Sequence, residues 1–102
     1  MSDTKAVVSA VNLAEIHSKL ISQGASEQDA WTDAKRLVDE VVPFAEEHAR
    51  LTGSLIERTK RYGLSLGDCA CLALGLMLDL PVYTADRAWK DVEAGVRVHV
   101  VR

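Results

Sequence analysis

The chain has 102 residues, 48% hydrophobic and 26% charged, with a formal net charge of −3 at pH 7. This length supports one domain, residues 1–102, and the composition excludes an intrinsically disordered chain. The net negative charge gives no overall basic surface for binding duplex nucleic acid, but it does not exclude a local basic groove. No apolar run reaches membrane-spanning length, and the first residues lack the apolar core of a signal peptide. We therefore expect a cytoplasmic protein without a membrane partner.

Apolar periodicity, helix caps and Gly or Pro stops predict alternating strands and helices. In chain order, we expect strand 7–9, helix 9–23, helix 27–40, strand 41–44, helix 45–51, a basic helical or looped stretch 54–62, helix 65–80, strand 82–84, a short helix or turn 87–94 and strand 96–101. Gly24, Gly53 and Pro81 are expected to end the helices before them. Strands that alternate with helices predict a parallel sheet with right-handed crossovers.

The two cysteines lie within the predicted helix 65–80. Cys69 and Cys71 are two positions apart, and helical side chains at this spacing do not face each other. We therefore expect reduced thiols instead of a disulfide or a shared zinc site. The three histidines are scattered along the chain without a metal-ligand spacing.

The stretch 64–86 carries the main functional signal. Ser65 and Asp68 have the spacing of a capping box at the start of a helix that is almost wholly apolar and therefore mostly buried. Asp86 follows the strand 82–84, at the position where open α/β sheets bind ligands. An acid on a first helical turn and an acid at a strand end can converge on one point.

A third acid, Glu15, lies beside the apolar stripe of the first helix. It could instead be a surface residue that pairs with Lys19 at the i,i+4 spacing. Clustered carboxylates raise one another's pKa unless a cation lies between them, and Mg²⁺ accepts such a cluster while it keeps several waters. A metal-held water can attack a phosphodiester, so the acids indicate metal-dependent hydrolysis as one hypothesis.

Four segments resemble those of a known family. These are SAVNLAEIHSKL (9–20), VVPF (41–44), LSLGDCACLALG (64–75) and VYTADRAWKDV (82–92). In combination and in this order they resemble PIN domains, particularly the VapC-type toxin nucleases of bacteria. The resemblance extends from about Val7 to Arg102, which is nearly the whole chain.

The resemblance implies a three-layer α/β/α fold with a parallel sheet and RNA cleavage that depends on Mg²⁺ or Mn²⁺. It implies a toxin of a type II toxin–antitoxin system, with RNA as substrate and a VapB-like antitoxin as partner. It assigns Glu15, Asp68 and Asp86 as metal-site acids and Thr84 as a hydroxyl that holds an acid or a water. It places Asn12 in the same pocket and gives Arg87 a contact to RNA or to the antitoxin. Arg87 could equally form an ion pair with a nearby acid.

One feature of the family has no counterpart in this sequence. Family members begin with a strand that ends in an aspartate and lies in the middle of the sheet, in the order 3-2-1-4-5. We therefore expect an N-terminally truncated domain with its first, central strand missing and a gap between two strand edges. The alternatives are a misassigned start or truncated chain, a second chain that fills the gap, direct pairing of the two strand edges with each other, and an inactive remnant of the family. Of these we favour a homodimer or another chain that covers the exposed edge.

Two other functions remain open from the sequence. The first is a catalytically inactive PIN-like module that binds antitoxin or RNA with an incomplete set of acids. The second is a flavodoxin-like phosphoacceptor or response-regulator fragment, which also has acids at strand ends. It is the weaker alternative, because no acidic pair follows the first strand and no lysine ends a strand.

Overall fold

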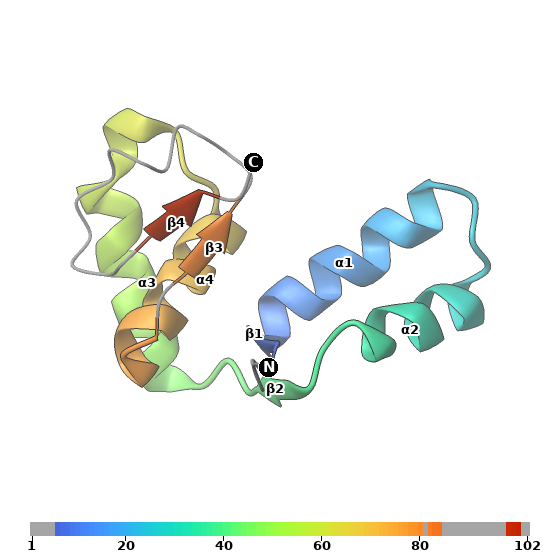
Figure 1. Cartoon of the computed structure of the whole chain (residues 1–102). Helices are drawn as coiled ribbons and strands as arrows, with labels where there is room; N and C mark the ends of the chain where they lie inside the picture. The colour runs from blue at the N-terminus through green and yellow to red at the C-terminus, as the bar shows by residue number, and fades with distance from the viewer. Residues whose placement is uncertain (1–5, 81, 85–97, 101–102) are drawn as a thin grey trace. The chain divides into compact units, whose positions relative to one another are not determined.

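The computed structural model describes residues 6–80, 82–84 and 98–100, in two compact units, Met1–Phe44 and Ala45–Arg102 (Figure 1). The first unit contains β1 (Val7–Ser9), α1 (Ala10–Ser22), α2 (Glu27–Arg36) and β2 (Glu40–Val42). The second contains α3 (Glu46–Arg58), the short 3-10 helix η1 (Lys60–Tyr62), α4 (Leu66–Leu78), β3 (Val82–Thr84) and β4 (Val98–Val100). Among the residues just given, each unit has a parallel pair of strands, which confirms the expected α/β class. In the described part, no helix is long and apolar enough to cross a membrane.

The first unit is built around a hairpin of α1 and α2 (Figure 1). Ser9 caps α1, and the chain leaves that helix through Gly24, whose φ of 109° is a conformation that favours glycine. Leu13 of α1 and Ala30 and Ala34 of α2 are buried. The two alanines let the helices approach closely, because a methyl group is the largest side chain that each presents.

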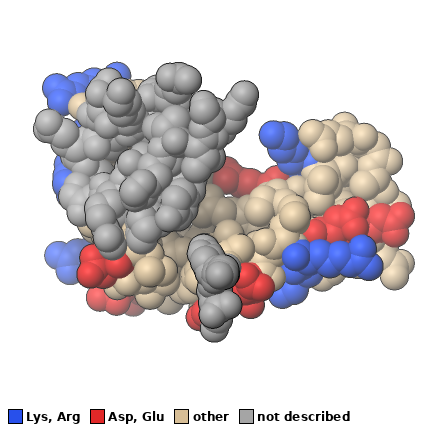
Figure 2. Space-filling model, in the orientation of Figure 1, with Lys and Arg blue, Asp and Glu red and all other residues tan. Residues whose placement is uncertain are grey.

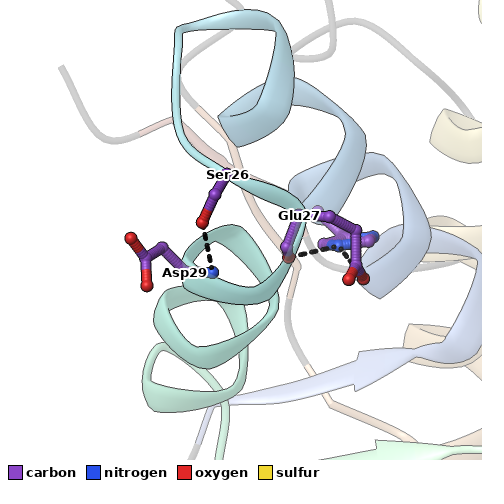
Figure 3. Close-up of polar contacts among 4 residues, drawn as sticks. Ser26, Glu27 and Asp29 are labelled. Atoms are coloured by element: carbon purple, nitrogen blue, oxygen red, sulfur yellow. Dashed lines mark hydrogen bonds and ion pairs between the residues drawn. The ribbon is translucent and has the colours of Figure 1, made fainter.

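Two polar arrangements fix the start of α2 (Figure 3). Ser26 Oγ accepts a hydrogen bond from the backbone N–H of Asp29 at 3.1 Å. His17 Nε2, on α1, lies 3.3 Å from Glu27 Oε2 and 3.3 Å from the Glu27 backbone oxygen. The imidazole also meets Trp31 edge to face, with 5.3 Å between ring centroids. These contacts join the first turn of α2 to α1.

The helix expected over 27–40 ends earlier than predicted. It stops at Arg36, and Glu40 already belongs to β2, which pairs with β1 in the register Val8↔Val41. The backbone N–H of Asp39 donates to the oxygen of Ala6 at 2.8 Å, and Asp39 Oδ2 accepts from the N–H of Ala6 at 2.7 Å. Pairing with β1 therefore takes up residues that local helix periodicity assigns to α2.

The second unit packs α3 against α4. Its buried core consists of Leu55 from α3 and Cys69, Leu72 and Ala73 from α4. Most of α4 is buried, as its apolar sequence predicts, and its seven buried residues are Gly67, Cys69, Ala70, Leu72, Ala73, Leu74 and Gly75. Cys69 and Cys71 are free thiols, as expected.

The prediction that Gly53 ends a helix is wrong, because α3 continues through it to Arg58. A glycine in a helix interior costs about 1 kcal/mol relative to alanine. The buried residues His48, Thr52 and Leu55 lie on either side of Gly53 in the chain and pack the helix into its unit. Burial of this face outweighs the local penalty at one exposed glycine.

The strand pairs agree with the expected sheet order as far as they are described. In the order 3-2-1-4-5, the second strand pairs with the third and the fourth pairs with the fifth. The structure shows these two pairings, β1 with β2 and β3 with β4, and both are parallel. The absence of the first, central strand and the single-domain organisation of residues 1–102 stay predictions.

Candidate metal-site carboxylates

Glu15 lies on α1 shortly after the carboxyl end of β1, and its side chain is exposed. Asn12 Nδ2 donates a hydrogen bond to Glu15 Oε1 at 3.1 Å. In the described part of the chain, Glu15 forms no ion pair with Lys19, the pairing that the sequence offered as an alternative to a role at the site. The carboxylate is therefore oriented by an amide at Oε1, and no hydrogen bond among the described residues engages its second oxygen, Oε2.

The Asn12 amide is itself held by Ser9, which ends β1 and is fully buried. Ser9 Oγ donates to Asn12 Oδ1 at 3.0 Å and accepts from the Asn12 backbone N–H at 3.3 Å. Because the hydroxyl hydrogen points to Oδ1, the amide NH₂ group points to Glu15. Sequence reasoning placed Asn12 near the site but did not identify Ser9, which it read only as the start of the helix.

Asp68 occupies the N3 position of α4 in a complete capping box and is half-buried. Its Oδ2 accepts from the Ser65 backbone N–H at 3.0 Å, and its own N–H donates to Ser65 Oγ at 3.1 Å. The cap engages one carboxylate oxygen, and Oδ1 forms no further hydrogen bond within the described residues. Asp68 thus has a structural role and one oxygen left that could hold a ligand.

The remaining predicted site residues come from the end of β3. Thr84 is the last residue of that strand and pairs in register with Val100 of β4. Asp86 and Arg87 lie outside the described residues, so their place in the site stays a prediction. Among the described residues there is no group of three or more His, Cys, Asp or Glu side chains that could hold a metal ion.

The described carboxylates nevertheless fit a hard divalent cation. Glu15 and Asp68 each present an oxygen that no described hydrogen bond occupies, and each is oriented by a donor on its other oxygen. Carboxylate oxygens are the ligands that Mg²⁺ and Mn²⁺ take in proteins. Glu15 and Asn12 belong to the first unit, and Asp68 and Thr84 belong to the second.

Charges of both signs lie side by side on the described surface. On the face that Figure 2 shows, outside the grey residues, the Lys and Arg side chains are interspersed with Asp and Glu. Two exposed pairs illustrate this, Lys60 with Glu57 at 3.3 Å and Arg36 with Asp33 at 3.8 Å. Arg61 donates to the Tyr62 hydroxyl at 3.0 Å and lies 5.0 Å from the centroid of that ring.

Comparison with protein-family models matches residues 1–95 to the PIN domain. The chain belongs to the PIN domain family. PIN domains are in general nucleases and typically use divalent metal ions, and their α/β fold agrees with the helices and parallel strand pairs described above. The comparison with curated proteins gave no match.

Proposed function

We propose that this PIN domain is a metal-dependent ribonuclease of the VapC type, the toxin of a type II toxin–antitoxin pair. The observation that carries the proposal is the family match over residues 1–95. The VapC assignment rests on the similarity of segments 9–20, 64–75 and 82–92 to that subfamily. The oriented carboxylates of Glu15 and Asp68 support a site of the kind that such a nuclease needs.

We assign the metal ligands as Glu15, Asp68 and Asp86, with Mg²⁺ or Mn²⁺ as the cofactor. When bound, the cation would stabilise charge on a phosphoryl oxygen and lower the pKa of a bound water. Asn12 holds the Glu15 carboxylate in one orientation, and Ser65 does the same for Asp68. Thr84 is proposed as a hydroxyl that holds an acid or a water, and Arg87 as a contact to RNA or to the antitoxin.

We also propose the partners that the sequence suggests: RNA as substrate, a VapB-like antitoxin, and a second copy or another chain along the sheet edge, all in the cytoplasm. Among the described strands, β1 pairs with β2 alone and β3 pairs with β4 alone. Sheets of two short strands gain stability from further strands. A strand from a partner chain beside β1 would supply this, and light scattering after size exclusion would report the assembly.

The test is cleavage of a mixed RNA pool in Mn²⁺ or Mg²⁺, together with Mn²⁺ binding measured without RNA. Glu15→Gln, Asp68→Asn and Asp86→Asn each remove one negative charge at nearly constant size. Because partners outside a metal's ligand shell already contribute ~10–100-fold to affinity, loss of a ligand should lower Mn²⁺ affinity by about 100-fold or more. Cleavage should fall with it.

Asp33→Asn is the matched control, because Asp33 is exposed and its one contact within the described part of the chain is a long ion pair with Arg36, at 3.8 Å. This variant should bind Mn²⁺ and cleave RNA like the unaltered chain. If Glu15→Gln and Asp86→Asn do the same, the assignment of the site is wrong. If the unaltered chain binds Mn²⁺ but cleaves no RNA, the inactive binding module takes the place of the nuclease.

A further inference from the structure

The hydrogen bonds of the Asn12 amide favour one orientation next to Glu15. Ser9 Oγ is buried and donates to Asn12 Oδ1 at 3.0 Å, so the amide oxygen is directed toward β1. The NH₂ group then donates to Glu15 Oε1 at 3.1 Å. A reversed amide would place its oxygen against the carboxylate and leave the Ser9 hydroxyl without this acceptor. Both contacts therefore favour the same rotamer.

This orientation makes the two oxygens of Glu15 different. Oε1 lies against the amide hydrogens, which carry partial positive charge and disfavour a cation at that oxygen. Among the described residues, Oε2 has no such donor. A cation at Glu15 is therefore favoured to bind one oxygen, Oε2, over chelation by both.

The binding mode of a carboxylate matters for the choice of metal. Mg²⁺ requires near-octahedral geometry, binds through one or two carboxylates and retains waters, whereas Ca²⁺ accepts more oxygens and often takes both from one carboxylate. An acid that offers one oxygen suits the smaller ion. An acid free to rotate can offer two and suits the larger ion better.

We propose that Asn12, held by Ser9, is a positioning residue that keeps Glu15 in one-oxygen coordination and so favours Mg²⁺ or Mn²⁺ over Ca²⁺. The inference rests on the proposed function, since it takes Glu15 as a metal ligand. It adds a determinant of metal selectivity that touches the metal only through Glu15.

The experiment measures metal binding without RNA, by electron paramagnetic resonance of Mn²⁺ with Mg²⁺ and Ca²⁺ as competitors. Asn12→Ala removes the amide, and Asn12→Leu removes it while keeping the side-chain volume, in case the smaller residue loosens the fold. We expect each to reduce the Mg²⁺ over Ca²⁺ preference by up to about tenfold, since loss of a partner outside the ligand shell changes metal affinity by ~10–100-fold. Circular dichroism should be unchanged.

Gln28→Ala is the matched control, because it removes an exposed amide from α2 of the same unit. Its Mg²⁺ over Ca²⁺ preference should equal that of the unaltered chain. Glu15→Gln distinguishes a failure of the inference about Asn12 from a failure of the proposed metal site. If Glu15→Gln lowers Mn²⁺ affinity but both Asn12 variants keep the preference, the inference alone is wrong. If Glu15→Gln binds Mn²⁺ normally, Glu15 is not a ligand, and both the inference and the proposed site are overturned.

Discussion

His48 Nε2, in α3, lies 2.9 Å from the backbone oxygen of Ala70 in α4, and His48 is 1% exposed. A carbonyl oxygen only accepts, so Nε2 carries the hydrogen and donates it. This bond joins helices whose residues are 22 positions apart in the chain. Because a hydrogen bond is directional, it favours one position of α3 along α4, whereas apolar contacts are not directional.

Replacement of His48 by leucine should destabilise the fold. His48→Leu keeps most of the side-chain volume but removes a buried hydrogen bond between helices, a change that costs about 1–3 kcal/mol in the free energy of unfolding. Thr52→Val is the matched control, because within the described residues Thr52 Oγ1 bonds only the His48 backbone oxygen one turn earlier in the same helix, at 2.7 Å. Urea denaturation should show a lower midpoint for His48→Leu than for Thr52→Val. Equal midpoints would show that the interhelical bond adds no stability.

Alanine at Gly53 should stabilise the protein. The position is inside α3, and among the described residues a Cβ built there meets no heavy atom within 4 Å beyond its chain neighbours and the adjacent helix backbone. Gly53→Ala should therefore raise the free energy of unfolding by about 0.5–1 kcal/mol, since alanine restricts the unfolded chain and favours the helix. Thermal unfolding followed by circular dichroism measures the change.

Gly63→Ala is the counterpart to this variant, with an effect of opposite sign. Gly63 also has open space around it, but its φ of 72° is a left-handed conformation that strains alanine. It should lower the melting temperature while Gly53→Ala raises it. Equal shifts in the same direction would contradict the helical role of Gly53.

Local sequence signals predict the start of a helix correctly where the contacts that fix it are between residues close in the chain. The sequence predicts helices that begin at residues 9, 27 and 65, and in the structure Ser9, Ser26 and Ser65 cap them, each accepting from the backbone N–H three residues on. Local signals could not predict that α3 continues through Gly53 or that α2 ends at Arg36. Their outcome depends on the packing of α3 onto α4 and on pairing of β2 with β1, which involve residues distant in the sequence.

The site shows the same division. The sequence pattern singled out the acids Glu15 and Asp68, the resemblance added Asn12, and spacing predicted the cap in which Asp68 participates. The direction of the Asn12 amide depends on which way the buried Ser9 hydroxyl donates, and that requires side-chain rotamers that no spacing rule supplies. Convergence of the three acids, including Asp86, stays a prediction.

The hairpin of the first unit should be sensitive to side-chain size at its interface. Ala34 is fully buried on α2, so Ala34→Leu adds three carbons to a packed interface and should cost about 1–3 kcal/mol. Ala14, exposed on α1, allows the same substitution without crowding, and Ala14→Leu should change stability by less than about 0.5 kcal/mol. Chemical denaturation compares the pair. A tolerated leucine at residue 34 would mean that α1 and α2 do not pack closely there.

The two roles of Asp68 can be separated by a pair of variants. Asp68→Asn keeps an oxygen that can accept from the Ser65 N–H, so it should cost little stability while it removes the charge that a metal requires. Ser65→Ala keeps the carboxylate but loses the hydroxyl that caps α4, at a cost of about 1 kcal/mol. We therefore expect Asp68→Asn to lose Mn²⁺ binding with a nearly unchanged melting temperature, and Ser65→Ala to lower the melting temperature while most Mn²⁺ binding remains. If Asp68→Asn instead lowers stability as much as Ser65→Ala and leaves Mn²⁺ binding intact, Asp68 is a helix cap and not a metal ligand.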